Sequence, residues 1–78
     1  MAMGMVKWFD GKRHFGFLVG EDGGEVFFHE TEVSEIDRPL GQGDRVTFRL
    51  EEGPRGLVAR RVFCVWRAHE MSPVDLAS

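Results

Sequence analysis

The chain has 78 residues, a net charge of −3 and a single cysteine. This length allows one small domain, the negative charge argues against binding led by bulk attraction to nucleic acid, and one cysteine excludes an internal disulfide, which fits a reducing compartment. The opening MAMGMVKWFD lacks the features of a secretory signal, and no apolar run approaches the roughly 18 residues of a membrane span, so we expect a cytoplasmic domain with no membrane partner.

Glycine-containing breaks separate short runs rich in β-branched and aromatic residues, which is typical of an all-β sandwich or barrel. These runs predict five strands, near residues 5–10, 14–19, 25–29, 44–51 and 57–66. Between the third and fourth strands, residues 31–43 predict one helical turn followed by a loop. The alternation of the last strand is broken at Arg60, where a β-bulge is expected. The domain is expected to span residues 1–66, with a polar, flexible tail over residues 67–78.

The second and third strands form a hairpin that is apolar on both faces. Because side chains alternate along a strand, one face carries three phenylalanines and a histidine: Phe15, Phe17, Phe27 and His29. The other face carries Gly16 and aliphatic residues such as Leu18. Placing the large rings inside would overfill a small barrel and would leave Gly16 facing water without a reason to be small. We therefore expect the aliphatic face to point inward.

No helix in the pattern is long enough to cover an open sheet, so the five strands are expected to close into an antiparallel barrel. Leu50 alternates with the apolar residues of the fourth strand and is also expected to point inward. The remaining predicted core residues are Val6, Leu18, Val26, Phe28, Val33, Val46, Phe48 and Val62.

This choice leaves the hairpin rings on the outside, with Trp8 beside them. An exposed aromatic cluster on a small domain generally marks a binding surface, and unpaired nucleobases stack on such rings at about 1–3 kcal/mol per base. Duplex bases are already stacked, so the surface favours single strands. The basic residues expected to hold phosphates are Lys7, Lys12, Arg13 and Arg55.

The segments GMVKWFD, FGFL and VFFHE, in this order and spacing, strongly resemble the cold-shock domain family. The resemblance runs from about Gly4 to Val62. It implies a five-stranded oligonucleotide-binding (OB) barrel that binds single-stranded RNA and DNA. It also implies roles as an RNA chaperone and as a regulator of transcription or translation.

Carried over by position, the resemblance implies base stacking by Trp8, Phe15, Phe17, Phe27 and His29, contacts to the backbone or polar groups by Lys7 and Arg55, and Phe9 at the margin. Further candidates for contact are Asp10, Lys12, Arg13 and His14. The sequence departs from the family at Glu30, which replaces an aromatic, at Asp10, which replaces asparagine, and at His14, which replaces glycine. The loop over residues 34–40 is also shorter and lacks an aromatic, so we expect an affinity below the family norm.

The same sequence also bears on metal binding, catalysis and polypeptide binding. The histidines and Cys64 lack the spacing of a metal site, and no catalytic motif is present, so we expect no enzyme, cofactor or small-molecule substrate. Cys64 is expected to fill space, while Phe63 and Trp66 are expected to pack the end of the barrel or the tail. Glu30 and Asp10 favour an alternative, a barrel that binds a polypeptide or a second copy. We expect a monomer, with a weak dimer as the alternative.

Overall fold

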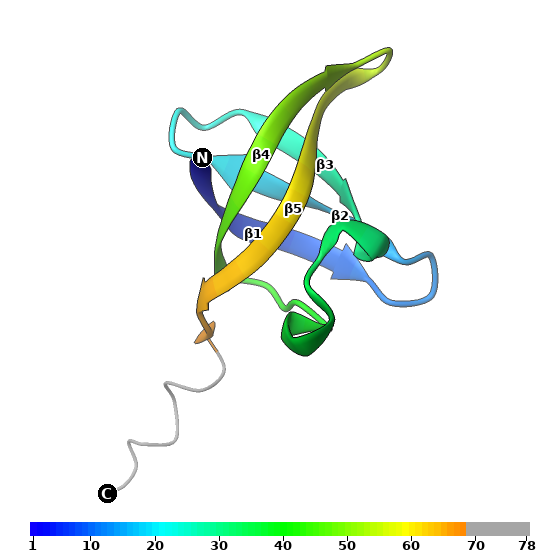
Figure 1. The fold of residues 1–78 in the computed structure, drawn as a ribbon, viewed down its shortest axis with the longest axis vertical. Coiled ribbons are helices and arrows are strands. Elements are labelled where there is room, and N and C mark those ends of the chain that lie inside the picture. Colours follow the sequence, from blue (N-terminus) through cyan, green and yellow to red (C-terminus); the bar gives the residue numbers. More distant parts are fainter. Residues whose placement is uncertain (69–78) are drawn as a thin grey trace, which may run out of the picture.

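Five strands close into a barrel in the order β1-β2-β3-β5-β4 (Figure 1). The computed structural model describes residues 1–68. Of the tail predicted to be flexible over residues 67–78, Arg67 and Ala68 are instead held by hydrogen bonds to Asp44, and residues 69–78 lie outside the described residues. The connection between β3 and β4 contains two short 3-10 helices where one turn was expected. The elements are β1 (Ala2–Asp10), β2 (Phe15–Gly20), β3 (Glu25–His29), η1 (Glu30–Glu32), η2 (Glu35–Asp37), β4 (Arg45–Gly53) and β5 (Gly56–Trp66).

The strand pairing confirms the predicted all-β, five-stranded barrel. Neighbouring strands pair in antiparallel fashion around most of the barrel. The exception is the closing seam, where β3 and β5 run parallel and Phe27 lies opposite Val58. A parallel bridge between Val33 and Val62 extends this seam. No helix in the part of the chain that the structure describes is long and apolar enough to cross a membrane.

The interior matches the predicted aliphatic core. Leu50 and eight other residues were predicted to point inward. Those eight are all buried, and Leu40 and Ala59 are buried with them. The prediction was wrong for Leu50, because 49 % of its surface is exposed. The pairing of β1 with β4 ends at Phe48, and beyond this point β4 and β5 continue as a projecting hairpin (Figure 1). The inward face of β4 therefore loses its cover at Leu50.

Two of the three register shifts in the strand pairing change the direction of side chains along β1 and the middle of β5, and the third lies between Arg45 and Val46 where β4 pairs with β5. On β1, the register shifts between Val6 and Trp8, so that Lys7 and Trp8 are both exposed although they are neighbours in sequence. On β5, an extra residue lies between Arg60 and Phe63, where Arg61 has a φ of 52°. The bulge predicted at Arg60 is thus confirmed, with the left-handed residue one position later.

A buried carboxylate fastens the end of β5 to the start of β4. Asp44 has no exposed surface and accepts hydrogen bonds from the backbone N–H groups of Gly41 and Ala68, both at 2.9 Å, and from the Arg67 guanidinium at 3.2 Å. Arg67 also donates to the Pro39 carbonyl at 2.9 Å and to the Asp37 carbonyl. We call Asp44, Arg67 and Ala68 the C-terminal latch.

Candidate nucleic-acid interface

Four rings from three adjacent strands form a continuous surface, which we call the aromatic face: Trp8, Phe15, Phe17 and Phe27. Antiparallel register places Phe17 opposite both Trp8 on β1 and Phe27 on β3. The ring centroids of Trp8 lie 5.8 Å from Phe15 and 5.4 Å from Phe17, and those of Phe27 lie 5.5 Å and 5.7 Å from the same two rings. Each ring therefore supports its neighbours, which restricts their rotation before any ligand arrives.

Gly16 lets this surface sit close to the core. A Cβ atom at this position would lie 2.3 Å from the Trp8 carbonyl oxygen and 2.9 Å from the Phe9 Cα atom. Gly16 is buried, whereas the flanking Phe15 and Phe17 are half-buried on the outer side. The absence of a side chain beneath β1 is thus what allows Trp8 and Phe17 to lie side by side.

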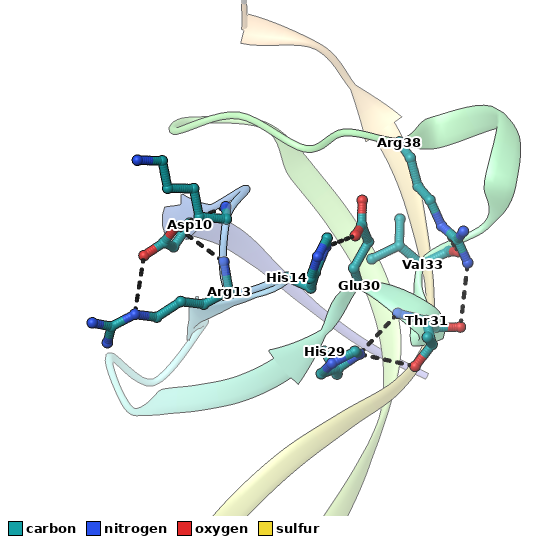
Figure 2. Close-up of polar contacts among 9 residues, drawn as sticks. Asp10, Arg13, His14, His29, Glu30, Thr31, Val33 and Arg38 are labelled. Carbon is teal, nitrogen blue, oxygen red and sulfur yellow. Dashed lines mark hydrogen bonds and ion pairs between the residues drawn. The ribbon is translucent and has the colours of Figure 1, made fainter.

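His29 extends the aromatic face at the end of β3 and also caps η1 (Figure 2). The backbone N–H of Thr31 donates to its Nδ1 atom at 3.2 Å, and the Thr31 hydroxyl lies 3.0 Å from the same atom. Because a backbone N–H can only donate, Nδ1 acts as the acceptor and the ring proton resides on Nε2. The exposed ring of His29 is therefore held in one tautomer, with Nε2–H left as a donor.

The turn between β1 and β2 explains the two departures from the family near it (Figure 2). Asp10 accepts hydrogen bonds from the backbone N–H groups of Lys12 at 2.9 Å and Arg13 at 3.3 Å, so its charge caps the turn. His14 has a φ of 66°, a conformation that favours glycine, and its Nδ1 donates to Glu30 at 2.8 Å. Asp10 and Glu30 are both engaged in local contacts.

The remaining candidates are less closely gathered. The Lys7 ammonium borders the aromatic face and forms an ion pair with Glu25 on β3. Arg55 is exposed in the turn between β4 and β5, at the tip of the projecting hairpin (Figure 1). Phe9 does not reach the aromatic face, because it is half-buried and stacks on Phe28, with 5.8 Å between the ring centroids. Lys12 and Arg13 are exposed in the turn beside Trp8 and Phe15.

Trp66 was expected to pack the end of the barrel or the tail. In the described residues 42 % of its surface is exposed, and tail residues 69–78 lie outside them. The Arg45 guanidinium carbon lies 5.9 Å from the centroid of its ring, within the range of a cation–π contact. Phe63 is exposed on the same strand. In residues 1–68, no cluster of histidine, cysteine or acidic side chains is arranged to hold a metal ion.

The comparisons with known proteins show the family and the fold of the chain. Residues 2–65 match the family model described as the 'Cold-shock' DNA-binding domain. The chain is 44 % identical over 64 residues to cold shock-like protein CspA of Shewanella violacea, a match that covers 80 % of this chain and 91 % of that protein. It is 40 % identical over 63 residues to cold shock protein CspC of Bacillus subtilis, covering 80 % and 96 % of the two chains.

Among solved structures, the fold resembles Drosophila Unr CSD456, with a TM-score of 0.68 and 29 % identity. That match covers 82 % of this chain but only 26 % of the Unr chain. With the barrel, the aromatic face and these relatives together, the chain belongs to the cold-shock domain family of nucleic-acid-binding proteins.

Proposed function

We propose that this protein binds single-stranded RNA and DNA in the cytoplasm by stacking unpaired bases on the aromatic face, and that it acts as a monomeric RNA chaperone or regulator of transcription or translation. The observation that supports this most is the set of four mutually packed rings on adjacent strands. Rings held in this way offer planar surfaces without a large loss of side-chain freedom on binding. His29 adds a fifth plane and Lys7 a nearby cation.

Stacking suits a protein with a net charge of −3. At about 1–3 kcal/mol per stacked base, three bases supply several kcal/mol with few phosphate contacts. Lys7 would have to exchange Glu25 for a phosphate, and the carboxylate of Glu30 stands beside the exit of β3. Both features weaken binding relative to a site with unpaired cations and a further aromatic ring, without altering the mode of binding.

The proposal is tested with a short oligonucleotide and a tryptophan signal from one site. In a Trp66→Phe variant, Trp8 is the only tryptophan, and a hexamer of deoxythymidylate or uridylate should quench its fluorescence. Phe15→Ala and Phe27→Ala should each weaken binding by roughly 5- to 150-fold, which corresponds to about 1–3 kcal/mol. Phe63→Ala removes an exposed ring away from the aromatic face and serves as the matched control. Unchanged affinity in both aromatic-face variants would contradict the proposal.

A polypeptide or a second copy is the competing occupant of the aromatic face. Asp10 and Glu30 were the features that favoured it, but both carboxylates have local partners in the turn and at His14. This alternative predicts no response to oligonucleotides and a stable complex or dimer in size-exclusion chromatography with light scattering.

A further inference from the structure

A second surface lies outside the aromatic face, along the first half of β1. A groove of about 570 Å³ is lined by Met3, Met5 and Lys7 on this strand and by Arg45 on β4, together with Glu21 and Gln42. Met3 and Met5 are 44 % and 41 % exposed, so the floor of the groove is apolar and open to solvent. Two basic residues, Lys7 and Arg45, line it.

The register of the barrel connects this groove with both tryptophans. Lys7 precedes Trp8 in sequence, and the β1 bulge turns both outward. At the other end, Arg45 lies opposite Met5 on β1 and opposite Trp66 on β5. The exposed ring of Trp66 therefore lies beside Arg45, which lines the groove, and Trp8 follows Lys7, which also lines it. A cation and an aromatic ring thus occur together at two places on this surface.

Charge separates the two halves of the molecule. Residues 1–30, which contain the aromatic face, carry three lysines and arginines against five acidic residues. Residues 45–66, which form β4 and β5, carry five arginines against two glutamates. A polyanion held on the aromatic face would therefore gain most from continuing toward β4 and β5, where Arg45 has no carboxylate partner among the described residues.

We propose that the groove along β1 continues the path of a single nucleic-acid strand from the aromatic face, with Arg45 binding a phosphate and Trp66 stacking a base beyond it. This inference rests on the proposed function. Met3 and Met5 provide an apolar floor for sugars and base edges. Glu21 stands on the wall and limits how many phosphates the groove accepts, so Arg45 and Trp66 are its main contacts.

The spacing sets the length of strand that the groove accepts. Trp8 and Met5 lie three residues apart along β1, which is about 10 Å at about 3.3 Å per residue. Met5 and Trp66 lie two strand spacings apart across the sheet, which is also about 10 Å at about 4.8 Å per strand. Because these two directions are perpendicular, the distance from Trp8 to Trp66 is about 14 Å. At about 3.4 Å per nucleotide, the rise of a stacked duplex strand, this distance corresponds to at most about four nucleotides, and an unstacked strand spans it with fewer. A hexamer that stacks on the four rings of the aromatic face and on His29 has too few nucleotides left to reach Trp66, whereas a dodecamer can cover both.

The test uses each tryptophan as the reporter of one end. The Trp66→Phe variant reports the aromatic face through Trp8, and the Trp8→Phe variant reports the groove through Trp66. At stoichiometric concentration, we expect oligodeoxythymidylate hexamer to quench Trp8 only and dodecamer to quench both. If both lengths quench Trp8 and neither quenches Trp66, the proposed path along the groove is overturned and the proposed function stands. A silent Trp8 would contradict the proposed function, and the continuous path with it.

Fluorescence anisotropy of labelled oligonucleotides then assigns the contacts. Arg45→Ala should weaken dodecamer binding by about five-fold or more and leave hexamer binding unchanged. Arg45→Lys keeps the charge and should recover most of the dodecamer affinity, which separates a phosphate contact from a disturbance of the fold. Equal loss for both lengths, or no loss for either, would overturn the proposal. A dimer that forms through the groove and prevents dodecamer binding would also overturn the proposal.

Discussion

Gly16 controls how closely β1 and β2 approach beneath the aromatic face. In a Gly16→Ala variant, the new methyl group would meet backbone atoms of Trp8 and Phe9 at 2.3 Å and 2.9 Å, and neither can move without shifting β1. We expect a loss of about 1–3 kcal/mol or more in the free energy of unfolding, measured by urea titration. Gly11→Ala is the matched control, because its nearest neighbour would be a Phe9 ring atom at 4.0 Å. Equal stability of the two variants would contradict this role for Gly16.

Cys64 provides a pH-dependent test at a single atom. Burial raises the pKa of the Cys64 thiol, while a hydrogen bond with the Trp66 backbone and the charge of Arg67 oppose it. The thiolate is the reactive form, so alkylation by iodoacetamide should show a midpoint at higher pH in the folded protein than in urea. Because the folded pKa is raised, the associated stability is fully present below the pKa of the unfolded thiol and is lost as pH rises through the folded pKa. A Cys64→Ala variant should lack this alkaline loss, and coincident alkylation midpoints would contradict the prediction.

The C-terminal latch joins elements that are far apart in the chain. Removing the Arg67 side chain leaves the fully buried Asp44 carboxylate with only its two backbone donors. Breaking a buried ion pair from one side costs about 3–5 kcal/mol, so Arg67→Ala should lower the free energy of unfolding by about 3 kcal/mol. The loss should be much less than additive with Asp44→Ala. Arg13→Ala removes an exposed partner of Asp10 at 3.9 Å and should change stability by less than about 0.5 kcal/mol.

Alternation along β2 and β3 was enough to predict the core and the outward-facing, half-buried rings, because each residue of a regular hairpin has its direction set by its neighbours. Lys7 and Trp8 depend on the β1 bulge, which places two consecutive residues outward and leaves no sign in the alternation. The prediction that Leu50 lies in the core was wrong for a different reason, because its exposure depends on where β1 stops pairing with β4. The parallel seam and the Asp44–Arg67 pair arise from contacts between distant segments, which a local pattern does not contain.

At the scale of the whole molecule, the aromatic rings and the arginines occupy different parts of the barrel. The rings belong to β1, β2 and β3, whereas half of the ten lysines and arginines fall within residues 45–66. Of the three lysines and arginines on the acidic half, two face carboxylates: Lys7 pairs with Glu25, and Arg13 pairs with Asp10. Stacking should therefore dominate the binding of a short strand on the aromatic face, and charge should contribute more when a longer strand extends toward β4 and β5.

The salt dependence of binding measures that ratio. For a hexamer confined to the aromatic face, about three phosphate contacts at about 0.7 per phosphate predict a log–log slope of affinity against salt near −2. Stacking is insensitive to salt, so affinity should persist where a charge-led protein would release its ligand. A dodecamer should show a steeper slope by about 0.7 for each added contact, and Arg45→Ala should return it toward the hexamer value. The measurement is anisotropy across a range of sodium chloride concentrations, with Arg45→Lys as the control. A hexamer slope steeper than about −5 would mean that charge rather than stacking leads binding, since neutralising that many phosphates requires more cations than the aromatic face has beside it.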